Sequence, residues 1–150
     1  MAKVFLCFSQ QLIEDIKSDE QFGSWSKTYQ FDVHGAYLEQ PLLESGAESD
    51  TFALPVKPGD SIYSLSVIFS SGDSYGTARG KGELVWCFPT YEAAEAAEKA
   101  YQDAIALGEC SVVFDVITET GEIQQVTVNN LGYGYHEDIQ QLVISTHSLE

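Results

Sequence analysis

Basic residues are scarce in this chain. Lysine and arginine together number 7 against 23 aspartates and glutamates, so 150 residues carry a formal net charge of −16 at pH 7. The acids are spread along the sequence, and no lysine or arginine follows Lys99. A surface of this sign repels nucleic acid and anionic membranes and attracts basic surfaces. We therefore expect a basic protein partner, with no direct binding to nucleic acid or membranes. An acid-rich proteome or a need for solubility would also produce this composition, and the oligomeric state stays open.

Long apolar runs and close cysteine pairs are also missing. No stretch approaches the roughly 18 consecutive apolar residues of a membrane-spanning helix, and the apolar start is too short for a signal peptide. The three cysteines, Cys7, Cys87 and Cys110, have no close pair, which favours free thiols in a reducing compartment. We expect a cytoplasmic location. Leu149-Glu150 is interpreted as a cloning-site remnant, which leaves one globular domain over residues 1–148.

Signatures of catalysis are absent as well. A phosphate-binding P-loop needs Gly-Lys-Ser/Thr followed by a helix, but Lys81 is followed by Gly82 and then by an expected strand. Ser74 has no histidine near it in sequence, and no serine stands in a Gly-x-Ser-x-Gly elbow. The histidines and acids match no metal-ligand spacing. We expect no catalytic residues, no metal and no cofactor, although whether the protein is an enzyme stays uncertain.

The apolar periodicity predicts strands and two helices. Period-two alternation at Tyr29, Phe31 and Val33 is typical of a half-exposed strand, whereas Leu12, Ile13 and Ile16 lie on one helical stripe. The pattern indicates an α+β fold: a mainly antiparallel sheet with two helices packed on one face. The expected helices are 10–20 and 91–107, and the expected strands are 3–8, 25–38, 51–56, 62–69, 83–88, 110–118, 123–129 and 139–147.

Two glycine-rich stretches, 70–82 and 130–138, are predicted to be loops at strand ends. Such loops often carry binding sites. The first holds Arg79, the only arginine, and Lys81. If the two loops meet, a small-ligand or enzyme pocket between them is an alternative function, and Glu137 and Asp138 are possible partners for the two bases. The candidate binding residues in these stretches are Asp73, Tyr75, Arg79, Lys81, Tyr133, Tyr135 and His136.

The outer face of the second expected helix is acidic. Glu92, Glu95 and Glu98 are predicted to point outward, where carboxylates can imitate the spacing of phosphates in nucleic acid. Together with the net charge, this favours a small non-catalytic protein that docks on a basic partner. It would be an inhibitor: an immunity-type protein, or an anti-defence protein that imitates nucleic acid. A structural component of a larger assembly is a further alternative, and its mark would be an exposed apolar patch.

Overall fold

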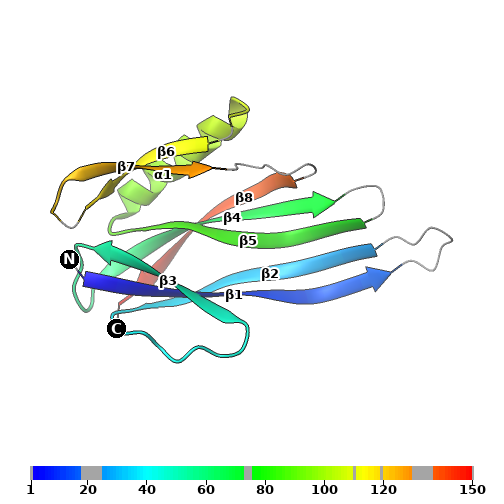
Figure 1. Cartoon of the computed structure of the whole chain (residues 1–150), viewed down its shortest axis with the longest axis horizontal. Helices are drawn as coiled ribbons and strands as arrows, with labels where there is room; N and C mark the ends of the chain where they lie inside the picture. Colours follow the sequence, from blue (N-terminus) through cyan, green and yellow to red (C-terminus); the bar gives the residue numbers. More distant parts are fainter. Residues whose placement is uncertain are drawn as a thin grey trace.

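The computed structural model describes residues 2–17, 25–72, 76–109, 111–118, 120–129 and 137–149. Strands account for 67% of the described residues, and Figure 1 shows the long strands of the larger sheet side by side along the molecule. The elements in order are β1 (Ala2–Lys17), β2 (Trp25–Tyr37), β3 (Ala47–Leu54), β4 (Ser61–Gly72), β5 (Gly76–Phe88), α1 (Tyr91–Ala106), β6 (Ser111–Ile117), β7 (Ile123–Asn129) and β8 (Glu137–Ser148).

The predicted fold class is wrong, because the described residues contain one helix of seven or more residues and not two. The expected helix at 10–20 is instead the second half of β1, where Gln10–Lys17 continues the strand without a break. This half pairs in antiparallel register with Trp25–Phe31 of β2. The spacing of Leu12, Ile13 and Ile16 favours a helix only weakly. The hydrogen bonds between the two strands of the long hairpin outweigh this local preference.

The main sheet is mixed, because one pair of strands at its centre is parallel. Six strands run in the order β3-β1-β2-β5-β4-β8, and β6 and β7 form a separate two-stranded sheet. All neighbours in the larger sheet are antiparallel except β2 and β5, which pair in parallel from Trp25↔Gly76 to Thr28↔Arg79. This short parallel seam joins the half made of β1, β2 and β3 to the half made of β4, β5 and β8 (Figure 1).

The second predicted helix and the predicted strands at 110–118 and 123–129 are confirmed. The hydroxyl of Thr90 caps α1 by accepting a hydrogen bond of 3.2 Å from the backbone N–H of Ala93, and Gly108 follows the helix with φ of 69°. Small alanine side chains on the buried face let α1 lie close to the sheet and to β6. β6 and β7 pair in antiparallel register. Among the described residues, no helix is long and apolar enough to cross a membrane.

Two apolar cores lie on the opposite faces of β4 and β5. Leu65 and Phe88 face α1 and β6, where Phe114 and Tyr101 join them in the first core. Ile62 and Cys87 face the other way, in the second core, toward residues of β1, β2 and β3. Burial of this kind contributes roughly 25 cal/mol per Å² of apolar surface.

The end of β8 closes the second core. Leu149, set aside above as part of a cloning remnant, is 2% exposed and forms a parallel bridge with Ala36 of β2. Its backbone N–H donates to the carbonyl oxygen of Asp60 at 2.9 Å, and its own carbonyl accepts from the N–H of Gly59 at 3.0 Å.

The stretch 70–82 is not the long loop that the sequence predicts. β4 continues to Gly72 and β5 starts at Gly76, so most of the stretch is paired strand. Its glycines serve close packing: a Cβ at Gly82 would overlap the ring of Phe31, and one at Gly80 would overlap the carbonyl oxygen of Tyr29. Gly80 has φ of 79° and marks a β-bulge opposite Ser70.

Candidate binding surfaces

The sequence-predicted site residues are described only in part. Asp73, Tyr75, Tyr133, Tyr135 and His136 lie outside the described residues. Arg79, Lys81, Glu92, Glu95 and Glu98 are described, the first two on β5 and the other three on α1.

Arg79 and Lys81 belong to a basic corner at the seam of β2 and β5. Arg79 is exposed and pairs in register with Thr28. The Nζ atom of Lys81 lies 5.1 Å from the centre of the Tyr29 ring, a cation–π contact worth about 0.5–1 kcal/mol at an exposed site. On the neighbouring strand, the Nζ atom of Lys27 lies 5.6 Å from the Trp25 ring. Lys81 thus covers an aromatic ring, which gives it a structural role.

The start of β8 lies at the same end of the sheet as this corner. Ser71 of β4 pairs with Ala78 on one side and with Glu137 on the other, and Ser70 pairs with Asp138. β4 therefore stands between the predicted acids and the predicted bases. Strands two positions apart in a sheet are separated by roughly 9–10 Å.

The acidic face of α1 is interrupted. Glu92 and Glu95 are exposed, but Glu98 is half-buried. Lys99 is exposed four residues after Glu95, the spacing and orientation at which a glutamate and a lysine attract each other on a helix. The helix thus presents separate acids around a base, not a continuous acidic stripe.

A groove between β3 and β5 is bordered by two acids, Glu48 and Asp50, that are not among the predicted site residues. Glu48 and Asp50 lie on the same face of β3 as Phe52, which packs against the second core. Along this face of β3, the side chains therefore change from apolar at Phe52 to acidic at Asp50 and Glu48, where the core ends. The groove beside them has a volume of about 490 Å³. Glu83 of β5 is also at its wall, but burial and the nearby charge of Glu83 raise the pKa of Tyr101 on α1, so this carboxylate lies on the helix side of β5.

The floor of this groove is aromatic. The rings of Phe8 and Phe31 lie with their centres 5.7 Å apart, on β1 and β2. Beside them, the side-chain oxygen of Gln10 accepts a hydrogen bond of 3.1 Å from the backbone N–H of Gly82 and ties β1 to β5. We call this site the acidic groove; it is lined by Phe8, Ser9, Gln10, Phe31, Gly46, Glu48, Asp50, Gly82, Glu83 and Leu84.

Large apolar side chains are exposed on the far half of the β1–β2 hairpin. Leu12 is 48% exposed, Ile13 57% and Ile16 53%. β3 pairs with β1 only as far as Ser9↔Ala47, whereas β2 pairs with it as far as Lys17. On the side away from β2, no described strand pairs with Gln10–Lys17. We call this the open edge of β1.

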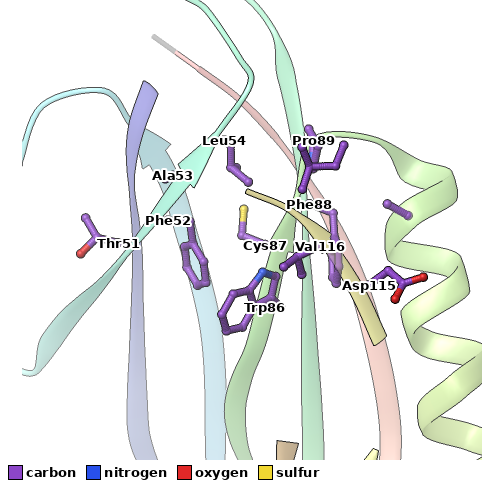
Figure 2. A pocket seen from close by; sticks show the side chains of 12 residues that line it. Thr51, Phe52, Ala53, Leu54, Trp86, Cys87, Phe88, Pro89, Asp115 and Val116 are labelled. Atoms are coloured by element: carbon purple, nitrogen blue, oxygen red, sulfur yellow. The ribbon is translucent and has the colours of Figure 1, made fainter. Parts of the chain in front are cut away.

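A smaller cavity lies between β3, β5 and β6 (Figure 2). Its volume is about 160 Å³, and its walls include Phe52 and Trp86, whose rings meet edge to face at 5.3 Å. Pockets for small molecules usually measure about 300–1,000 Å³. This cavity is therefore better explained as a packing gap where the two cores meet.

Two serine–histidine pairs form across strands, and neither is arranged for catalysis. Ser64 and His147 are joined at 2.9 Å, but both are buried. Ser9 and His34 are joined at 2.6 Å. Ser9 pairs with β2 on one side and β3 on the other, so the sheet engages the backbone N–H groups that would have to hold an oxyanion.

Compared with protein-family models, curated proteins and solved structures, the chain matches none of them.

Proposed function

We propose that this is a small cytoplasmic, non-catalytic protein that binds a basic protein partner, and that the acidic groove receives a lysine or arginine side chain of that partner. The observation that carries the proposal is the position of Glu48 and Asp50 beside an aromatic floor in the groove. Carboxylates form charge-assisted hydrogen bonds with ammonium and guanidinium groups, and aromatic faces attract the same cations.

The charge of the whole protein supports this function. With a formal net charge of −16, the protein attracts a basic partner over a distance before contact is made. An inhibitor that covers a basic active site, whether of the immunity type or a mimic of nucleic acid, would use such attraction. The groove is a better docking site than the outer face of α1, because Lys99 divides the acids there.

A structural role in a larger assembly is the second candidate. The exposed side chains of Leu12, Ile13 and Ile16 favour it, because contiguous apolar surface commonly marks a protein interface. The small-ligand alternative depends on Tyr75, Tyr133 and His136, which lie outside the described residues.

Two variants with equal charge changes distinguish binding at the acidic groove from attraction by the overall negative charge of the protein. Glu48→Gln/Asp50→Asn neutralises the groove, and Glu92→Gln/Glu95→Gln neutralises the same number of acids on α1. The probe is a nine-residue arginine peptide, with affinity measured by calorimetry at low and moderate salt. We expect binding to weaken as salt rises, and the groove variant to bind about tenfold more weakly than the helix variant.

Other outcomes are equally informative. Equal losses in the two variants would mean that the peptide senses only the overall field, and the groove would not be the site. A larger loss in the helix variant would move the site to α1. Affinity that does not change with salt would contradict recognition of a basic partner. Capture from the native host, read by mass spectrometry, then identifies that partner.

A further inference from the structure

The open edge of β1 is a long strand segment with one unpaired side. In Figure 1, β1 extends well past the region where β3 lies beside it. All side chains from Gln10 to Lys17 are exposed. The backbone N–H and C=O groups on the free side of such a strand can pair with another extended segment, which is how proteins bind peptides by strand addition.

Apolar side chains give the edge a surface that an added strand can cover. Leu12 and Ile16 are each about half exposed, and Ile13 is the extra residue of a β-bulge, opposite the step from Tyr29 to Thr28. The bulge divides the edge into two short pairing segments, Gln10–Leu12 and Glu14–Lys17. An added strand would pair with both and cover the apolar side chains between them.

The charges on this edge select the kind of strand. Glu14 and Asp15 are adjacent, exposed and central in the edge. Like charges on directly opposed strands are destabilising, whereas opposite charges contribute favourably. A second copy of this chain would bring its own −16 charge and its own acids to the edge, so self-pairing is disfavoured.

The edge also leads directly to the acidic groove. Gln10 begins the edge and lines the groove, and Gly46, just before β3, lines it too. A strand added along the edge would therefore end beside Glu48. The two features form one continuous surface.

We propose that the open edge of β1 binds an extended, basic segment of the partner protein as an additional strand. Lysine or arginine side chains of that segment lie opposite Glu14 and Asp15, and one end of the segment reaches the acidic groove. This inference rests on the proposed function, because it takes the partner to be basic.

Two peptides and one charge-reversed variant test the proposal. The probes are an eight-residue peptide in which two pairs of adjacent lysines alternate with valines, so that lysines lie on both faces of the strand, and its counterpart with glutamates in place of the lysines. We expect the lysine peptide to bind and to slow amide hydrogen exchange in Gln10–Lys17. In Glu14→Lys/Asp15→Lys the lysine peptide should bind about tenfold more weakly and the glutamate peptide correspondingly more tightly. Both positions are exposed, so the variant should fold normally, as checked by circular dichroism and thermal unfolding.

Each of the other possible results contradicts one part of the proposal: the site, the charge selection or the occupant of the edge. Binding of the lysine peptide without protection of Gln10–Lys17 overturns the open edge as the site and leaves the proposed function standing. Equal binding of both peptides to the unaltered protein overturns charge selection. Protection of the edge without peptide, together with a dimer in analytical ultracentrifugation, shows a second copy as the occupant. If neither the arginine nor the lysine peptide binds, the proposed function falls first, and this inference falls with it.

Discussion

The imidazole Nε2 atom of His147 lies 2.9 Å from the hydroxyl oxygen of Ser64, across the β4–β8 pair and inside the protein. The histidine is 9% exposed and the serine is fully buried. Burial disfavours the charged imidazolium, so the pKa of His147 is lowered below its ordinary value of 6.5. The pair is therefore a neutral hydrogen bond whose stability depends on pH.

That dependence has a definite sign. The unfolded chain protonates His147 near pH 6.5, whereas the folded protein does so only at lower pH. Stability is thus fully present above pH 6.5 and falls as the pH drops toward the folded pKa, by at most about 1.4 kcal/mol per pH unit. His147→Gln should flatten this slope. The check is urea unfolding of both proteins at about pH 7.5 and about pH 5.5, and identical slopes would contradict it.

Ser66, two residues along β4, should be dispensable. Its hydroxyl is buried, and within the described part of the chain it has no hydrogen-bond partner. Ser66→Ala should stabilise the protein by about 1 kcal/mol, because it removes an unpaired polar group. Ser64→Ala is the matched control and should destabilise by about 1–3 kcal/mol, because it leaves His147 without its partner. Equal effects of the two substitutions in chemical unfolding would argue against this distinction.

Gly80 should tolerate no side chain. Its φ of 79° costs an alanine about 1–2 kcal/mol, and the added Cβ would also overlap the Tyr29 carbonyl oxygen. Gly59→Ala is the control, because Gly59 has φ of 90° with open space around its Cβ position. Gly80→Ala should therefore lower the free energy of unfolding by clearly more than Gly59→Ala does. A similar loss in both would show that the bulge moves away from β2 at little cost.

Cys87 should be chemically inert in the folded protein. It is 1% exposed, and burial raises the pKa of its thiol to about 12. At pH 8 only about one molecule in ten thousand would carry the reactive thiolate. Iodoacetamide should leave Cys87 unmodified in native protein and modify it fully in guanidinium chloride, as read by peptide mass spectrometry. Rapid labelling under native conditions would mean that the second core opens readily.

The sequence predicts best where local signals agree with the final pairing. Thr90, the alanines and Gly108 define α1 without help from the rest of the fold. The β6–β7 hairpin likewise needs only its own alternation and turn. Gln10–Lys17 could not be predicted in this way, because its apolar spacing suits a helix and only the pairing with β2 makes it a strand.

The candidate site was hidden for a related reason. The glycines at positions 76–82 suggest a loop. In the structure, Gly82 is part of a strand, and its lack of a side chain leaves room for the ring of Phe31. The acidic groove draws on four strands, and the only local trace of it is the period-two row of Glu48, Asp50, Phe52 and Leu54. The strand predicted from the sequence begins at residue 51, which separates the two acids from that row.

The position of β8 has a consequence for synthesis. β4 is flanked by β5 and β8. Because Ser61 of β4 pairs with Ser148 of β8, the second strand of this pair leaves the ribosome long after the first. Until residues 137–148 emerge, β4 presents a bare edge beside Leu65 and Val67, which is the kind of surface on which nascent chains aggregate. We expect the yield of folded protein in cells to respond more to chaperone supply than to substitutions that stabilise the finished sheet.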